Sequence, residues 1–162
     1  MFFAALFATY YDLKSTNAVW PPPEVHFDQL GSAAGTFMLF AGSAVMFPFM
    51  RALDRRNLQA AYAWLYVGII GGIGFMAFEL RSWAKEDFTM HSSAYASIYL
   101  TMTGFHFLHV LVGVVLLTAL FLGLRSAALE ADHHAGAEAI SYYWHFVFVV
   151  WIGIYTTIYW IR

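Results

Sequence analysis

Thr101-Met-Thr-Gly-Phe-His106-Phe-Leu-His109-Val-Leu-Val-Gly113 lies within an apolar run from Ser97 to Leu124, which is long enough to cross a bilayer as one helix. His106 and His109 are three residues apart, so they share one face of that helix. A thioether and a glycine continue the same face, while the other faces are apolar. Because an unpaired imidazole facing lipid is costly, we expect this stripe to face protein.

A third histidine lies in Tyr142-Tyr-Trp-His145-Phe-Val-Phe-Val-Val-Trp151, on the following helix. Three interpretations are open. The first is a haem or metal site built from His106 or His109 with His145. The second is a proton or ion path that includes Glu79, an acidic residue within an apolar span. The third, which we favour, is a buried hydrogen-bond network that fixes how the helices pack.

The depths of the histidines argue against haem. His106 and His109 lie roughly 14–18 Å from the side where their helix begins. His145 lies roughly 22–24 Å from that side in a hydrocarbon core of about 30 Å. Two axial ligands of one iron need nearly the same height.

The composition indicates an integral membrane protein. Of 162 residues, 61% are hydrophobic, 20% aromatic and only 11% charged, with a mean hydropathy of +0.63, whereas about a quarter of a soluble domain is charged. The net charge of -2 gives no reason to expect nucleic acid as a partner. The chain has no cysteine, so it has no disulfide and no thiolate metal site.

We therefore expect an all-α integral membrane fold, in which one transmembrane domain over residues 1–162 forms an antiparallel helix bundle. It should have four full spans and a short first helix. The expected segments are about 1–11 (partial), 32–53, 61–83, 97–124 and 140–161. Pro48 should kink the first full span. The GxxxG pair Gly68 and Gly72, with Gly71 and Gly74 beside it, should let another backbone approach closely.

Two connections bear on orientation and on metal binding. The lysines and arginines of the loops and ends number four on each side of the membrane, so their count does not decide the orientation. We therefore rely on the dense Arg51–Arg56 cluster, which we place in the cytoplasm, with the C-terminus outside. In the predicted loop 125–139, His133 and His134 stand among acidic residues. A solvated loop is the favoured interpretation there, with a divalent-cation site as the alternative.

Five motifs together resemble subunit III of haem-copper oxidases, the cytochrome-c oxidase subunit 3 family. The order and spacing of the two histidine motifs are specific, the resemblance covers nearly the whole chain, and the proline-rich motif is most similar to the actinobacterial branch. The motifs are Trp20-Pro-Pro-Pro-Glu24, Phe78-Glu79-Leu-Arg81, Ser92-Ser-Ala-Tyr95, Thr103-Gly-Phe-His106-Phe-Leu-His109-Val110 with Gly113, and Tyr143-Trp-His145-Phe-Val with Val150-Trp151.

The resemblance implies an accessory subunit of a proton-pumping cytochrome c oxidase in a bacterial plasma membrane. Such a chain carries no catalytic centre, haem, copper or other metal site; haem and copper belong to the partner subunits. It flanks catalytic subunit I, with subunit II as a further partner, binds phospholipid, and supports turnover stability and proton uptake. Its polar network at the lipid cleft would comprise Glu79, Arg81, His106, His109, Trp144 and His145. A small membrane haem protein, an ion or proton transporter, and a related subunit of a quinol oxidase or nitric oxide reductase are the alternatives.

Three departures from the family pattern stand out. A buried glutamate that the family usually carries just before the position of Met1 is missing. Phe148 replaces an aspartate one turn beyond His145 and removes its carboxylate partner, and Phe107 replaces a glycine at a close helix contact. Glu79 should then be ionised and paired with Arg81 or with a neighbouring tyrosine or tryptophan, because its depth differs from that of the first histidine by about 8 Å.

Overall fold

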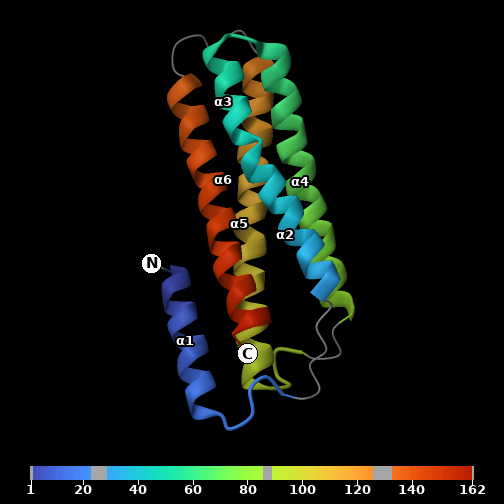
Figure 1. Cartoon of the computed structure of the whole chain (residues 1–162), viewed down its shortest axis with the longest axis vertical. Coiled ribbons are helices and arrows are strands. Elements are labelled where there is room, and N and C mark those ends of the chain that lie inside the picture. The colour runs from blue at the N-terminus through green and yellow to red at the C-terminus, as the bar shows by residue number, and fades with distance from the viewer. Residues whose placement is uncertain (1, 23–28, 86–88, 126–132, 162) are drawn as a thin grey trace.

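The structure is a computed structural model that describes residues 2–22, 29–85, 89–125 and 133–161. Within these ranges the regular elements are all helical, and the longest run side by side along one axis (Figure 1). In chain order the elements are α1 (Phe2–Thr16), α2 (Gln29–Ala44), α3 (Met46–Asp54), α4 (Leu58–Lys85), α5 (Ala94–Arg125), α6 (His133–Tyr155) and the π-helical turn η1 (Thr156–Trp160).

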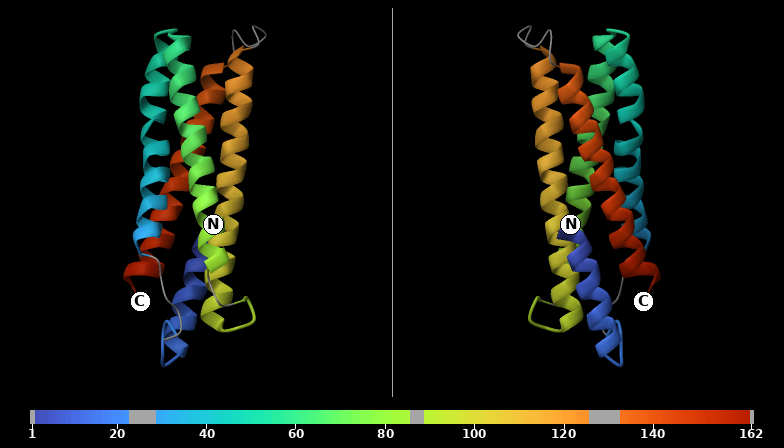
Figure 2. Two further views of the ribbon diagram at one scale, coloured as in Figure 1. Left: turned by 90° about the vertical axis from the view of Figure 1, so that its right-hand side faces the viewer. Right: turned by 90° about the vertical axis from the view of Figure 1, so that its left-hand side faces the viewer.

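Four segments of this bundle are long and apolar enough to cross a membrane. They are 31–54, which joins α2 and α3, 58–85, 94–124 and 134–160. Successive spans run antiparallel, and the two side views show them packed along most of their length (Figure 2). The helix α1 is shorter and lies beside the lower halves of α5 and α6 (Figure 1). The predicted fold class, an all-α membrane bundle with four full spans and a short first helix, is confirmed.

The helix of the first span is interrupted just before Pro48, as predicted. Pro48 has no N–H, so it cannot donate to the carbonyl group of Ala44, four residues earlier. The helix α2 ends at Ala44 and α3 begins at Met46. Backbone hydrogen bonds from Val45 to Ala41 (3.0 Å) and from Phe49 to Val45 (3.1 Å) carry the chain across the break. One span therefore contains two helical segments.

The helices extend beyond the apolar segments that we predicted. The clearest case is α6, which begins at His133 rather than at residue 140, so the predicted loop 125–139 is wrong in its second half. The residues after His134 are mostly alanine, and alanine has the highest helix propensity. Hydropathy marks where a helix leaves the hydrocarbon, whereas helical hydrogen bonding continues into the interfacial region. The first helix is longer for the same reason, ending at Thr16 rather than near residue 11.

The glycines of α4 face either the backbone or the side chains of neighbouring helices. A Cβ added at Gly71 would lie 3.2 Å from the carbonyl oxygen of Met38 and 3.6 Å from Cα of Gly42, so Gly71 is where the α2 backbone approaches. Gly68 and Gly72 instead face side chains of neighbouring helices. The predicted close approach of another backbone to these glycines therefore exists, and it is closest at Gly71, beside the GxxxG pair.

Helix α1 is attached to the rest of the bundle by apolar and polar contacts. Phe7 packs over Gly153, where an added Cβ would lie 2.9 Å from the ring. The hydroxyl of Tyr10, which is fully buried, donates to the carbonyl oxygen of Thr157 at 3.2 Å. The helix α1 therefore belongs to the same core as α5 and α6.

Candidate functional site

Trp144 occupies the centre of the bundle, in a slot formed by glycines of three other helices. A Cβ added at Gly113 on α5 would lie 2.5 Å from Cζ3 of Trp144, and one at Gly72 on α4 would lie 2.7 Å from its Cη2. At Gly42 on α2 the added atom would lie 3.3 Å from Nε1. The indole is fully buried. One side chain of α6 thus contacts three neighbouring helices at positions where only glycine leaves room.

His106 is fully enclosed by aromatic rings. It stacks on Trp151 with the ring centroids 5.1 Å apart and the planes at 26°. Phe75 of α4 meets its edge at 5.7 Å, and Phe3 of α1 lies at 6.3 Å. Its side chain is 1% exposed, and neither ring nitrogen has a hydrogen-bond partner in the described part of the chain. His106 is therefore the polar centre of an aromatic contact among α1, α4, α5 and α6.

His109 is only partly buried and is used locally. Its Nδ1 lies 2.7 Å from the carbonyl oxygen of Phe105, one turn earlier on the same helix. Phe3 packs edge-on against its ring at 5.0 Å. The hydroxyl of Tyr143 on α6 donates to the backbone carbonyl oxygen of His109 at 3.0 Å. The backbone of His109 therefore links α5 to α6, and its ring contacts α1.

His145 has a partner that the sequence did not indicate. Its Nδ1 lies 2.6 Å from the hydroxyl oxygen of Ser43 on α2, and Phe47 packs against its ring at 5.0 Å. Phe148, one turn beyond His145, packs on Phe40 at 5.7 Å. The hydroxyl of Ser43 is therefore the side-chain hydrogen-bond partner of His145.

The histidines do not converge on one point. His106 is level with Trp151, and His145 lies six residues before Trp151 on α6, which is about 9 Å along the axis. His106 faces α4 and α6, whereas His145 faces α2. In the described ranges no three histidine, aspartate or glutamate side chains gather closely enough to hold a metal ion.

Glu79 and His106 lie at nearly the same height, which corrects the predicted offset of about 8 Å. Gly72 faces Val114 across the α4–α5 contact. Because the two helices run antiparallel, seven residues onward to Glu79 on α4 correspond to seven residues back on α5, which reaches Phe107. The estimate failed because it placed the end of α4 level with the start of α5, whereas Trp83, near the end of α4, contacts Thr103, nine residues after the start of α5. Glu79 is 3% exposed, so both polar side chains of this layer are buried.

Arg81 does not share the buried position of Glu79. Two residues apart on a helix means a rotation of about 200°, and Arg81 is exposed. Trp83, on the same side as Glu79, donates through Nε1 to the hydroxyl of Thr103 at 3.2 Å. Phe107 packs on Trp83 at 5.3 Å, so the added bulk at this position extends the α4–α5 contact.

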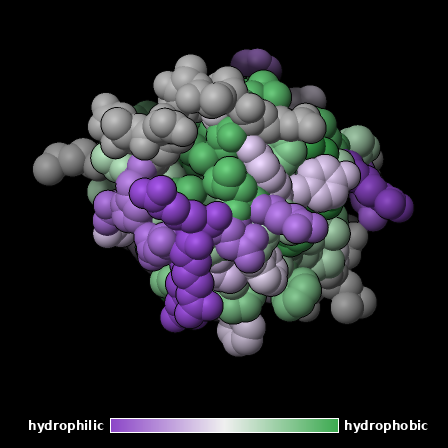
Figure 3. Space-filling model, turned by 90° about the horizontal axis from the view of Figure 1, so that it is seen from above, coloured by the Kyte–Doolittle hydropathy of each residue, from purple (hydrophilic) through white to green (hydrophobic). Residues whose placement is uncertain are grey.

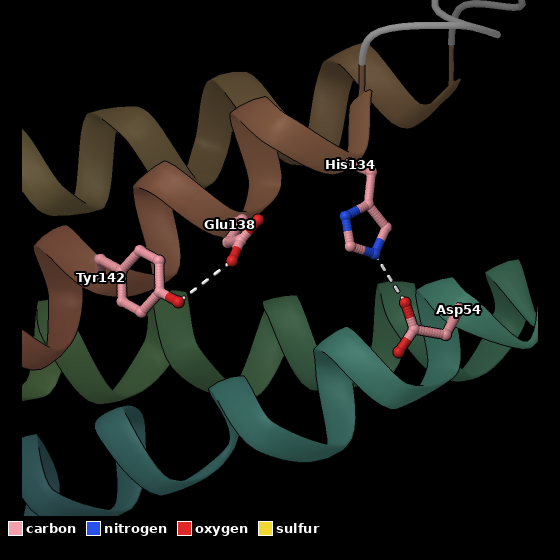
Figure 4. Close-up of polar contacts among 4 residues, drawn as sticks. All are labelled: Asp54, His134, Glu138 and Tyr142. Carbon is pink, nitrogen blue, oxygen red and sulfur yellow. Dashed lines mark hydrogen bonds and ion pairs between the residues drawn. The ribbon is translucent and has the colours of Figure 1, made fainter.

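A second polar cluster lies at the opposite end of the bundle, between α3 and α6 (Figure 4). Nε2 of His134 lies 2.6 Å from Oδ1 of Asp54. One turn further along α6, the hydroxyl of Tyr142 donates to Glu138 at 3.0 Å. Both members of the first pair are more than half exposed. His134 thus joins two helices and does not lie in a solvated loop; Glu130 and Asp132 lie outside the described residues.

The fold and these contacts define a class: a multi-pass helical membrane protein in which several intramembrane polar side chains contact neighbouring helices of the same chain. A model of the cytochrome c oxidase subunit III family matches residues 1–162. The chain belongs to this family, and it is an accessory subunit of a haem-copper oxidase. The haem-protein and transporter alternatives are not favoured.

Relatives from distant organisms agree with this assignment. A probable cytochrome c oxidase subunit 3 of Nocardia farcinica is 32% identical over 166 residues, which cover all of this chain and 82% of the relative. The subunit 3 of Corynebacterium diphtheriae has the same identity over 168 residues, again covering all of this chain and 82% of the relative. That of the lemur Lemur catta is 32% identical over 170 residues, covering 98% of this chain and 61% of the relative.

Proposed function

We propose that this chain flanks the catalytic subunit I of a proton-pumping cytochrome c oxidase, together with subunit II, in the plasma membrane of a bacterium. Its role is to stabilise the catalytic subunit and to sustain proton uptake, while haem and copper belong to the partner subunits. The observation that carries the proposal is the use of the polar groups within the spans. Trp144, His109 and His145 all contact neighbouring helices of this chain. They serve a rigid scaffold rather than a reaction centre.

The proposed orientation places the turn between α3 and α4 in the cytoplasm and the C-terminus outside. Arg51, Arg55 and Arg56 gather at this turn, at the upper end of Figure 1, and the positive-inside rule assigns such clusters to the cytoplasm. Lys14, at the end of α1, lies at the opposite end of the bundle. A protease site or thiol label introduced at each end of the chain in intact cells tests this orientation.

Glu79 and His106 are proposed to be structural members of the polar network. They lie level across the α4–α5 contact, and both are buried, as described above. Neither ring nitrogen of His106 has a hydrogen-bond partner in the described part of the chain, so the ring is held by its contacts with Phe75 on α4 and Trp151 on α6. These contacts, with Glu79 buried in the same layer, would fix how far α4 can slide along α5.

The experiment compares Glu79→Gln with Glu138→Gln in purified oxidase. Glu138→Gln is the matched control, because it makes the same change at an exposed position. We expect Glu79→Gln to lower retention of the subunit on subunit I, measured by mass spectrometry, while oxygen-reduction turnover of the intact complexes stays near wild type. Full retention with sharply slowed proton uptake would assign Glu79 to a proton path and refute the structural role.

Association with subunit I has its own test. Affinity purification of this chain from native membranes should recover a large haem-bearing subunit, identified by its optical spectrum and by peptide mass spectrometry. A monodisperse chain that purifies without a haem-bearing partner and moves ions in liposomes would contradict the proposed function.

A further inference from the structure

The turn between α3 and α4 contains a small basic pocket. It has a volume of about 240 Å³, and its polar lining comes from Arg51, Arg55 and Asn57. Trp64 and three smaller residues of α3 and α4 form its apolar part. The two arginines are four residues apart, so they lie on one side of the chain as α3 ends. In the view onto this end of the bundle, hydrophilic side chains gather over one part of the surface beside apolar ones (Figure 3).

The positive charge of this pocket is not neutralised by the acids of this chain that lie near it. Asp54 faces α6, where it contacts His134 at 2.6 Å. Glu138 accepts the hydroxyl of Tyr142 at 3.0 Å. Among the described residues, neither of the two pocket arginines forms an ion pair. The two guanidinium groups therefore remain free to bind an anion from outside the chain.

The start of α4 adds to this attraction. Oδ1 of Asn57 accepts the backbone N–H of Ala60 at 3.1 Å and so caps the helix. Within the described ranges, the amide nitrogen of the same side chain has no acceptor, so it can donate to a ligand. The helix α4 has 28 residues, and the positive end of its dipole lies at this pocket. Two guanidinium groups, an amide donor and a helix N-terminus thus converge on one place.

The size and setting of the pocket indicate the kind of anion. Sites that enclose a whole small molecule usually measure about 300–1,000 Å³, so a pocket of about 240 Å³ has room for a single side chain. Arg55 and Asn57 lie between the apolar spans 31–54 and 58–85, so the charged part of the pocket is at the end of the bundle. Guanidinium groups bind carboxylates through two parallel hydrogen bonds. Tryptophan and arginine, which line this pocket, are also the residues that contribute most to binding between proteins.

We propose that this pocket receives an aspartate or glutamate side chain from a cytoplasmic segment of the catalytic subunit I. The two arginines bind the carboxylate, and Trp64 lies beside its methylene stem. A pocket with two unpaired positive charges requires a negative group on its partner, and such complementarity fixes the register of an interface. The inference rests on the proposed association with subunit I and on the proposed orientation, and it adds a surface through which the two chains bind.

The test is zero-length cross-linking of purified oxidase with a water-soluble carbodiimide, which joins an amine to a carboxylate but does not couple arginine. Arg51→Lys and Arg55→Lys each place an amine in the lining and keep the positive charge. Arg56→Lys is the matched control, because Arg56 lies on the same turn outside the lining. We expect the two pocket variants to join this turn to an aspartate or glutamate of subunit I, identified by peptide mass spectrometry. The yield should be roughly tenfold higher than in Arg56→Lys.

Three results would overturn the proposal. Equal yields from all three variants would mean that the general charge of the turn attracts subunit I. Products that end only on Asp54 or Glu138 would mean that the pocket serves this chain alone. An intact complex that gives no product in either pocket variant would mean that no protein carboxylate occupies the pocket.

A second pair of variants tests the pocket with both arginines intact. Ala60→Glu adds a carboxylate of this chain to the lining, and Ala60→Gln adds similar bulk without charge. At low salt, Ala60→Glu should release the subunit from solubilised oxidase roughly tenfold faster than wild type, while Ala60→Gln stays near wild type. Equal rates for the two variants would count against the site. Co-purification of the wild-type chain with subunit I is measured first, so a failed association is a separate result.

Discussion

Gly113→Ala is the sharpest test of the central packing. The new Cβ would lie 2.5 Å from Cζ3 and 2.6 Å from Cε3 of Trp144. Carbon atoms in favourable contact are about 3.5 Å apart or more, so the indole would have to move by about 1 Å. Its other side is closed, because an atom at the Cβ position of Gly72 would already lie 2.7 Å from the same ring system. Overpacking of this kind costs about 1–3 kcal/mol, which offsets any gain in helix propensity of about 1 kcal/mol.

The matched control is Gly104→Ala, on the same helix. An added Cβ at Gly104 meets nothing within 4 Å. The assay is thermal dissociation of the subunit from purified oxidase, followed by gel and mass spectrometry. We expect Gly113→Ala to lower the dissociation temperature clearly, while Gly104→Ala stays at or slightly above wild type. In a double-mutant cycle, Trp144→Phe should reduce the effect of Gly113→Ala, because the smaller ring leaves room. If the two alanine variants behave alike, or if the effects in the cycle are additive, then Gly113 does not provide the space that Trp144 occupies.

Three further predictions concern other polar groups and haem. Ser43→Ala should lower the free energy of unfolding by about 1–3 kcal/mol, and with it the midpoint of thermal unfolding, because Nδ1 of His145 loses its hydrogen bond to the Ser43 hydroxyl (2.6 Å). An unchanged midpoint would show that another group replaces the hydroxyl. Asp54→Asn should cost less than about 1 kcal/mol and only at low salt, because its pair with His134 is exposed on both sides; a large effect at high salt would contradict this. The purified subunit should show no stoichiometric Soret band, and such a band would return the histidines to the haem interpretation.

The sequence was sufficient to predict the number and type of the spans. Runs such as Ser97 to Leu124 have a length that a bilayer prescribes, and a proline in a helix interior removes one defined hydrogen bond. The polar stripe was predicted to face protein, and His106 and Gly113 do lie buried. These features depend on residues that are close along the chain, so the hydrophobic pattern of the sequence predicts them.

The contacts across helices were not predictable in the same way. The partner of His145 is Ser43, 102 residues earlier in the chain, and nothing in either local pattern indicates the pairing. The slot for Trp144 needs glycines on three separate helices, each of which looks like an ordinary small residue in its own span. The height of Glu79 was misjudged because the end of α4 is not level with the start of α5, and hydropathy does not indicate how two helices are staggered.

The slot for Trp144 has a consequence for how the protein is made. The ribosome delivers α2, α4 and α5 to the membrane before α6, which carries Trp144. Until α6 arrives, Gly42, Gly72 and Gly113 lack the side chain that packs on all three. The nascent chain therefore inserts as a loose set of helices and closes only once α6 has entered the membrane. A nonsense mutation that removes α6 would leave an open bundle in the membrane, a natural substrate for membrane proteases before it could reach its oxidase.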